Sequence, residues 1–325
     1  MKNKAFVSII INNYNYGHFL KDAIDSALNQ TYERFEVIVV DDGSTDNSRE
    51  IIASYGAHIV PILKENGGQA SAFNAGFAAS RGDIICFLDA DDMFLPEKLQ
   101  EVVEGFGERE DLDWCFHPLK FVDVRETDIR KEYADYKISN EKAEKREYDL
   151  REQVKRGRIT DKTLLYPSTS GLCLSRRLLE KILPMPVAEK QLLNDGYLIF
   201  TALGLSKGFV LNKKLGLYRL HGNNAHGIER IPGTDTFVIR SDKQHRKGKI
   251  LILKGYWIKK QFPEFAKLCN YFMASGIGLA WRHGGLDTEF QKLVNTYRAS
   301  LTIPEKIELL ARAIYAYLKD SRTTF

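Results

Sequence analysis

Hydrophobic and polar residues alternate along the first 120 positions in a way that predicts buried strands separated by helices. Apolar, largely β-branched runs at residues 6–11 and 35–40 are typical of buried strands. A weaker run at 58–64 predicts a third strand, and residues 83–88 predict a fourth. Between them, residues 18–29, 45–54 and 69–80 carry apolar or small side chains at helical spacing. This order of strands and helices predicts βαβ units and therefore a parallel sheet flanked by helices.

Three of the predicted strands lead directly into a cluster of polar residues. The clusters occupy residues 12–15, 41–44 and 89–92, and they read NNYN, DDGS and DADD. In an open parallel sheet, ligands bind just beyond the carboxyl ends of the strands. We therefore expect the functional site at that edge of the sheet.

The third cluster places Asp89, Asp91 and Asp92 within four positions. Carboxylates this close repel one another at neutral pH unless a cation or several hydrogen-bond donors lie nearby. An Asp-x-Asp at a strand end offers the hard oxygen ligands that Mg²⁺ and Mn²⁺ prefer, with positions left for water and phosphate oxygens. The loop is either simply solvated or half of a clamp for a divalent cation and a diphosphate, and its place at a strand end favours the clamp.

Two common nucleotide motifs are missing from the chain. Neither the dinucleotide pattern GxGxxG nor the P-loop pattern GxxxxGK[ST] follows the first strand. A Rossmann dinucleotide site and an NTPase are therefore both disfavoured.

The rest of the chain divides by composition. Residues 125–162 contain twelve Lys or Arg and ten Asp or Glu, which indicates either a solvated insertion or a flap over the site. Residues 163–225 resume sheet and helix, and the pattern is helical beyond about residue 245. In the last helix one apolar stripe, for which we expect core packing rather than membrane contact, comprises Ile307, Leu310, Ala311, Ile314 and Leu318.

Composition limits the possible functions. The 325 residues are 44% hydrophobic and 28% charged, as is ordinary for a globular protein. The formal net charge of +4 is small for this length, so we expect no nucleic-acid partner. The four cysteines form no CxxC pair, and no stretch approaches the ~20 apolar residues that span a bilayer. We expect a cytoplasmic protein, and peripheral association with the inner face of a membrane stays open.

A set of ordered motifs covers most of the first ninety residues. They are VSIIINNYN (7–15), SALNQTY (26–32), EVIVVDDGSTD (36–46), NGGQA (66–70), NAG (74–76), RGD (81–83) and FLDADD (87–92). Weaker echoes follow at NDG (194–196) and YRLH (218–221). In this order the motifs resemble those of the family 2 glycosyltransferases.

The resemblance implies a fold and a division of the chain. The expected fold is GT-A, an α/β fold with a mostly parallel sheet flanked by helices, here followed by a helical C-terminal region. Residues 1–225 would form the GT-A domain and residues 226–325 the helical region. Within the domain, residues 1–120 would be the nucleotide-sugar-binding half, 125–162 the charged insertion or flap, and 163–225 the acceptor-side half.

The resemblance also implies an activity. The family transfers a sugar from a nucleotide-diphosphate donor, here a UDP- or dTDP-sugar, by direct displacement assisted by Mn²⁺ or Mg²⁺ and with inversion. A surface polysaccharide, a lipid-linked oligosaccharide and a protein glycan stay open as acceptors. The alternative from another class is a GT-A-like module that binds nucleotide sugars without turnover. A nucleotidyltransferase would need a basic glycine-rich loop that residues 12–17 do not provide.

Residue-by-residue matching to the family motifs assigns roles to the polar clusters. The donor nucleotide would be bound by Asn13, Tyr14, Asn15, Asp42, Asp89 and Ala90, with Asp42 accepting the imide N–H of uracil or thymine and Asp89 near the ribose. Asp91 would bind the metal, and Asp92 would support it through hydrogen bonding. His221 is either a further metal or diphosphate ligand or an ordinary loop histidine.

The catalytic base implied by the resemblance is Asp195, in the segment Asn194-Asp195-Gly196. The simpler interpretation is that Asp195 caps the helix predicted at 197–205, and the two roles are compatible. The chain departs from the family pattern at two positions. Phe73 stands where many relatives have Arg, and Asn194 stands where relatives usually have Glu.

Overall fold

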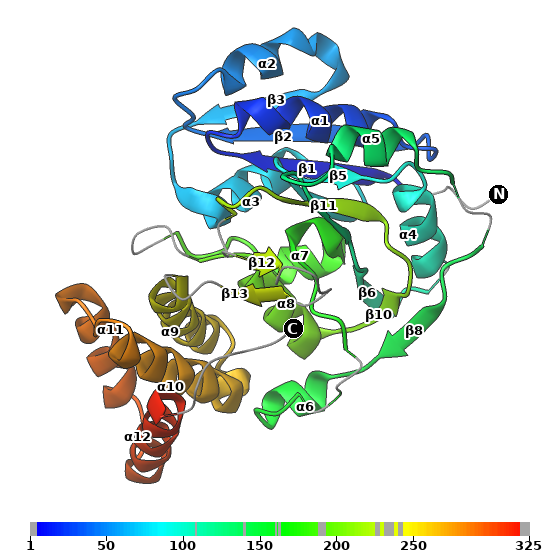
Figure 1. Ribbon diagram of the computed structural model, residues 1–325. Coiled ribbons are helices and arrows are strands. Elements are labelled where there is room, and N and C mark those ends of the chain that lie inside the picture. The colour runs from blue at the N-terminus through cyan, green and yellow to red at the C-terminus, as the bar shows by residue number, and fades with distance from the viewer. Residues whose placement is uncertain are drawn as a thin grey trace. The chain divides into compact units, whose positions relative to one another are not determined.

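The computed structural model describes residues 5–107, 109–138, 141–159, 161, 164–187, 193–224, 228–230, 237–239 and 243–318 (Figure 1). The chain divides into two compact units. The first comprises residues 1–151, 161–187 and 198–219, and the second comprises residues 152–160, 188–197 and 220–325.

Strands and helices alternate in the first ninety residues in the order expected from the sequence. The strands are β1 (Val7–Asn13), β2 (Phe35–Asp42), β3 (Val60–Lys64), β4 (Ile84–Asp89), β5 (Met93–Phe94), β6 (Leu112–Phe116), β7 (Lys120–Asp123), β8 (Lys145–Tyr148), β9 (Leu172–Ser175), β10 (Lys207–Leu211), β11 (Gly216–Leu220), β12 (Ile228–Arg230) and β13 (Phe237–Ile239). The helices are α1 (Gly17–Leu28), α2 (Ser48–Ser54), α3 (Gly68–Ala79), α4 (Lys98–Phe106), α5 (Ile129–Ala134), α6 (Arg151–Lys155), α7 (Arg176–Ile182), α8 (Gly196–Leu205), α9 (Gln244–Gln261), α10 (Ala266–Arg282), α11 (Thr288–Ala299) and α12 (Ile303–Leu318). Short 3₁₀ turns are η1 (Gly56–His58), η2 (Thr169–Gly171) and η4 (Pro263–Phe265). The strands and helices predicted in the first ninety residues are confirmed, with bounds that differ by at most three residues.

An eight-stranded sheet forms the core of the first unit, in the order β3-β2-β1-β4-β9-β6-β10-β8. Strands β3, β2, β1 and β4 run parallel to one another. Strand β9 is antiparallel to both β4 and β6, β10 is parallel to β6, and β8 closes the edge antiparallel to β10. The predicted α/β fold with a largely parallel sheet is confirmed. Part of the charged segment 125–162 is the edge strand β8.

Helices cover both faces of the parallel strands (Figure 1). On one face, Ile9 and Ile11 of β1 share a buried cluster with Leu20 and Ile24 of α1. On the other face, α3 approaches so closely that a β-carbon at Gly76 would lie 2.5 Å from Cγ2 of Ile10. Strands β1, β2 and β4 are therefore buried on both sides, as their apolar runs predicted, whereas the edge strand β3 is exposed or half-buried.

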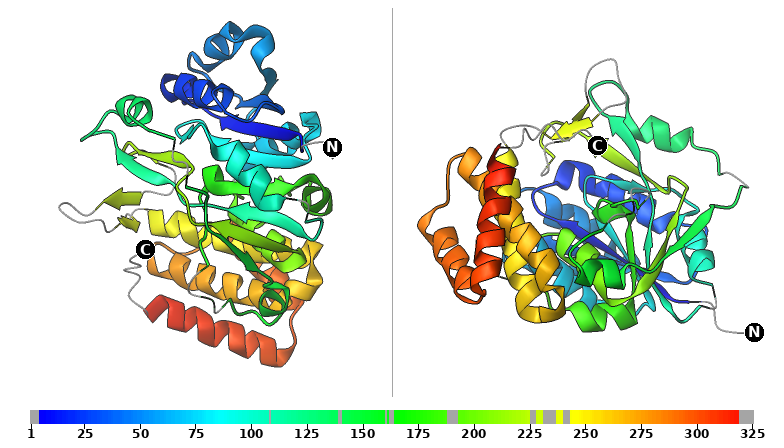
Figure 2. Two further views of the ribbon diagram at one scale, coloured as in Figure 1. Left: turned by 90° about the vertical axis from the view of Figure 1, so that its right-hand side faces the viewer. Right: turned by 90° about the horizontal axis from the view of Figure 1, so that it is seen from below.

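The second unit contains a helical assembly in which α10 packs against both α9 and α12 (Figure 2). Small residues allow the helices to approach closely. A β-carbon at Gly276 would lie 2.6 Å from the carbonyl oxygen of Gly248 on α9, and one at Gly278 would lie 2.4 Å from that of Ala313 on α12. None of the described helices is both long enough and apolar enough to cross a bilayer.

The expectation of core packing for the stripe on α12 is wrong. Ile307 and Leu318 are 65% and 67% exposed, and Leu310 and Ile314 are nearly half exposed. The buried positions are instead Leu309 and Ala313. Alanine at 313 permits the close crossing with α10, so the face that packs is selected by side-chain size.

Candidate active site

The register of the sheet brings the three polar clusters to one edge. Asn12 at the end of β1 pairs with Asp89 at the end of β4, and Asn13 pairs with Asp41 at the end of β2. The side chains follow the same pairing. Asn12 Nδ2 donates to Asp89 Oδ1 over 2.9 Å, and Asn13 Nδ2 donates to Asp41 Oδ1 over 2.9 Å.

The first two clusters are tied together by hydrogen bonds. Asn15 adopts a left-handed conformation with φ of 56°, which asparagine tolerates better than most residues. Its backbone N–H donates to Ser44 Oγ over 2.9 Å, and its Oδ1 accepts from the Thr45 N–H over 2.7 Å. The side chain of Tyr14, which precedes Asn15 in the chain, is 48% exposed. Asn13 is buried, and its Oδ1 has no hydrogen-bond partner among the described residues.

The carboxylate of Asp42 is held at the start of α3. Its Oδ1 accepts from Lys64 Nζ over 2.5 Å and from the Gly67 N–H over 3.0 Å, while Oδ2 accepts from the Gly68 N–H over 2.7 Å. Asp42 is only 3% exposed. A carboxylate has about four acceptor positions, so three donors leave about one for a ligand.

The acidic cluster of Asp89, Asp91 and Asp92 is compact but not uniform. One ligand atom from each lies within 4.8 Å of the others, a spacing that suits a metal ion. Asp92 is turned inward, where Oδ2 accepts from Ser170 Oγ over 2.6 Å and Oδ1 accepts from the Arg219 N–H over 3.0 Å. Burial, reinforced by the charges of Asp91 and Asp89, raises the pKa of Asp92 well above its usual value. Asp89 and Asp91 are half-buried, so these two carboxylates are the ones presented to a ligand.

Arg219 of β11 bonds the acidic turn, the segment Asp89–Asp92 that carries the acidic cluster. Its Nε donates to the Asp91 carbonyl oxygen over 2.8 Å, and its Nη2 donates to Asp22 Oδ2 over 2.9 Å. Its guanidinium also lies 4.4 Å from the ring centroid of Phe19. With its side chain 6% exposed, Arg219 is an interior support of the turn.

A second support comes from η2. Ser170 Oγ accepts from the Asp89 N–H over 3.1 Å while it donates to Asp92. The Ser170 carbonyl oxygen accepts in turn from the fully buried Lys98 Nζ over 2.9 Å. Burial lowers the pKa of Lys98. A polar network thus runs from the acidic turn into the core.

Asp195 and His221 belong to the second unit and are described within it. Asp195 directly precedes α8, is 7% exposed, and accepts the Gly196 N–H at Oδ1 over 2.7 Å. The N–H of His221 donates to Asn224 Oδ1 over 3.0 Å. Their roles as base and ligand stay predictions.

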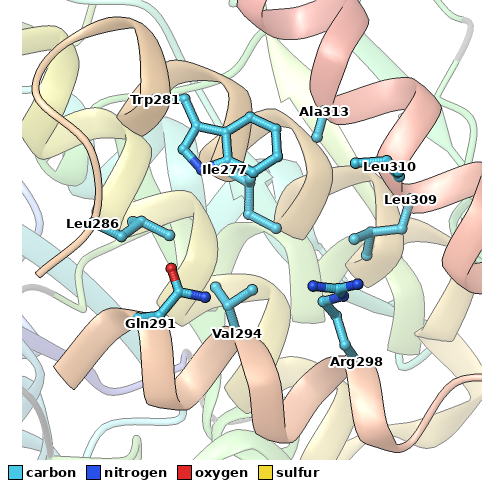
Figure 3. Close-up of a pocket in the computed structure, with 9 residues that line it drawn as sticks. All are labelled: Ile277, Trp281, Leu286, Gln291, Val294, Arg298, Leu309, Leu310 and Ala313. Atoms are coloured by element: carbon cyan, nitrogen blue, oxygen red, sulfur yellow. The ribbon is translucent and has the colours of Figure 1, made fainter. Parts of the chain in front are cut away.

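A cavity of about 40 Å³ lies among α10, α11 and α12 and is mainly apolar (Figure 3). Its lining residues are Ile277, Trp281, Leu286, Gln291, Val294, Arg298, Leu309, Leu310 and Ala313. It has no acidic group and no room for a nucleotide sugar. This cavity is therefore separate from the candidate active site.

Comparison with known families agrees with this geometry. The family model for glycosyl transferase family 2 matches residues 8–183, which include the ends of β1, β2 and β4. The chain belongs to this family. The match also includes Ser170.

Two relatives are also named glycosyltransferases. An uncharacterized glycosyltransferase of a Nostoc species is 38% identical over 224 residues, which are 68% of this chain and 66% of the relative. Another, from Rickettsia typhi, is 36% identical over 165 residues, which are 50% of each chain. The chain thus spans between half and two thirds of the length of these two relatives.

Solved structures agree on the fold. The crystal structure of S. aureus TarS 1-349 in complex with UDP-GlcNAc has a TM-score of 0.51 and 18% identity, and the match covers 96% of this chain and 81% of that one. Such a likeness shows a shared fold. Together with the family match it establishes the predicted GT-A fold.

Sequence reasoning missed the residues that support the site. Arg219 lies in the YRLH echo and Ser170 in a polar turn before β9, but neither has a local pattern that indicates contact with the acidic loop. Lys64, which bonds Asp42, is the last residue of the short strand β3, and nothing in its local sequence indicates that contact. Ala90 is buried in the core cluster, so a donor contact there would come from its backbone.

Proposed function

We propose that this family 2 protein is an inverting glycosyltransferase that moves a sugar from a UDP- or dTDP-sugar to a hydroxyl acceptor. The observation that carries the proposal is the edge of the sheet where β1, β2 and β4 end. There Asp42 is held beside α3, and Asp89 and Asp91 are presented while Asp92 is turned inward.

The presented carboxylates fit a divalent cation. Asp91 would bind Mn²⁺ or Mg²⁺ directly, and Asp89 would bind it or the ribose, since both offer the hard oxygen donors that these ions prefer. When bound, the cation would neutralise charge on the diphosphate leaving group. Asn12 holds Asp89 in place through its amide.

The nucleoside would lie against the loops after β1 and β2. Asp42 has about one acceptor position left for an imide N–H, and its three donors fix its direction. Exposed Tyr14 would cover the base or ribose, while Asn13 and Asn15 keep the two loops joined.

Asp195 would accept the proton of the attacking hydroxyl. This assignment is supported by its match to the family motif, by its burial and by the Gly196 N–H that orients it. His221 remains a candidate ligand of the metal or diphosphate. The four buried free thiols suit a reducing cytoplasm, and we propose a glycan or lipid-linked acceptor there, with a place at the inner membrane face as one setting.

A panel of UDP-, dTDP- and GDP-sugars tests the function, each assayed for thermal stabilisation with Mn²⁺ and for hydrolysis. Asp195→Asn should fold normally and bind the donor unchanged, but lose about 10²–10⁴ in rate, the usual contribution of a general base. Donor binding without turnover by the wild type would favour a binding module. Near wild-type turnover by Asp195→Asn would place the base elsewhere.

A further inference from the structure

Asp195 has a buried lysine as a neighbour, contributed by α9. Lys254 is 7% exposed, as is Asp195 itself. The lysine side chain reaches the start of α8 so closely that a β-carbon at Gly196 would lie 2.5 Å from its Nζ and 3.3 Å from its Cε. A carboxyl group and an amine, both withdrawn from water, therefore flank the same glycine.

Two charged groups among the described residues act on this amine. Burial lowers the pKa of Lys254 to about 8, the negative charge of Asp195 acts in the opposite direction, and Lys247 on the same helix lowers the pKa further. Helix α10 contributes the ring of Phe272, 5.1 Å from Nζ, rather than a charge. From α8, the buried Tyr197 donates its hydroxyl to Gln261, and burial raises its pKa. Within the part of the chain that the structure describes, Asp195 is thus an acidic group that acts on Lys254, and at neutral pH the lysine is mostly an ammonium ion.

The neighbouring residues are consistent with this closeness of Lys254 and Asp195. The backbone of Gly196 is not left-handed, so its missing side chain is explained by space for the lysine rather than by conformation. Asn194 Oδ1 lies 3.3 Å from the same β-carbon position. Asn194 carries no charge, so among the described residues Asp195 is the carboxylate that acts on Lys254.

We propose that Lys254 is a positioning residue for Asp195, with an ammonium group that keeps the carboxylate ionised and fixed at the start of α8. The inference rests on the proposed role of Asp195 as the base. It gives the C-terminal helices a part in the reaction, because the lysine comes from α9.

The test is the pH profile of kcat/KM for hydrolysis of UDP-glucose, UDP-galactose or UDP-GlcNAc, whichever the wild type turns over fastest. Lys254→Met removes the charge, and Gly196→Ala displaces the amine while keeping the charge. Both should shift the acidic limb upward by about one pH unit, as expected for loss of an opposite charge beside a carboxylate, with the donor KM unchanged. Above about pH 8, where Lys254 is neutral in the wild type, the profiles of Lys254→Met and the wild type should converge.

Lys249→Met is the matched control, since Lys249 on the same helix bonds Asp287 over 2.8 Å and should leave the profile in place. If Lys254→Met is too unstable to assay, Gly196→Ala decides the question alone. Profiles that superimpose on the wild type overturn the inference. Loss of activity in Asp195→Asn together with such profiles would overturn it while leaving the proposed function intact. Full activity in Asp195→Asn would show that Asp195 is not the base, and the inference about Lys254 would then fail with it.

Discussion

Replacement of Arg219 by methionine should destabilise the first unit and weaken metal-dependent nucleotide binding together. Methionine keeps an unbranched apolar stem but removes two hydrogen bonds, one to the Asp91 carbonyl oxygen and one to Asp22 Oδ2. The Arg219–Asp22 pair is buried on both sides, with side chains 6% and 8% exposed. Water therefore replaces the lost contacts poorly.

The magnitude follows from these contacts. Removing one partner of a buried ion pair costs about 3–5 kcal/mol, because the other charge is left without compensation. Asp22 keeps one cation, since Arg130 Nε donates to its Oδ1 over 2.8 Å. We therefore expect the lower end of the range, about 3 kcal/mol in the free energy of unfolding. Release of the Asp91 carbonyl oxygen should also weaken UDP binding in Mn²⁺ by about tenfold, the equivalent of one charged hydrogen bond.

Urea unfolding and calorimetric titration of UDP with Mn²⁺ measure the two effects. Arg130→Met is the matched control, because it removes the other cation of Asp22 from an arginine that is 64% exposed. That exposed pair should contribute only about 1 kcal/mol or less. If Arg219→Met is no less stable than Arg130→Met and binds UDP as the wild type does, Arg219 is not a support of the acidic turn.

Three further predictions concern single carboxylates and the buried lysine. UDP affinity should fall when EDTA removes the metal, and Asp91→Ala should abolish that dependence while Asp92→Ala retains part of it; equal wild-type affinities with and without EDTA in calorimetry would contradict the clamp. Asp42→Ala should weaken UDP by about tenfold or more and reduce its advantage over GDP in competition assays, and a wild-type preference for GDP would refute the base assignment. Because the pKa of Lys254 is about 8 in the folded chain and 10.5 for a lysine exposed to water, as in the unfolded chain, the folded form binds fewer protons between these values. Wild-type stability should therefore rise with pH from about 8 to 10.5 by about 3 kcal/mol relative to Lys254→Met, and parallel urea-unfolding curves across that range would contradict the burial of a charged lysine.

The parallel half of the sheet could be predicted because β1, β2 and β4 are apolar runs, which are stable only when both faces of the strand are buried. It did not predict β8, whose residues read KREY. An edge strand needs no apolar side chains on its open side, and charged residues there discourage pairing with other chains. Its strand character depends on pairing with β10, which lies some sixty residues later in the chain. A local pattern therefore cannot reveal it.

Some residues of the candidate site could likewise be predicted from the local sequence, and others could not. Residues that follow strands were predicted, because strand ends converge wherever a parallel sheet forms. Arg219 contacts Asp92 across 127 positions of sequence, and no periodic pattern carries that information. The departure at Phe73 is explained by packing, since this fully buried ring meets Phe87 edge-on at 4.8 Å.

The crowding of three aspartates, which suggested a metal site, is resolved by the fold in two different ways. Asp92 is compensated within the protein, because both of its oxygens accept hydrogen bonds from protein groups and burial raises its pKa. Asp89 and Asp91 remain half-buried at the rim, where a cation can reach them. A ligand therefore has to compensate two negative charges rather than three. A dication accomplishes this, and its remaining coordination positions stay available for the oxygens of a diphosphate.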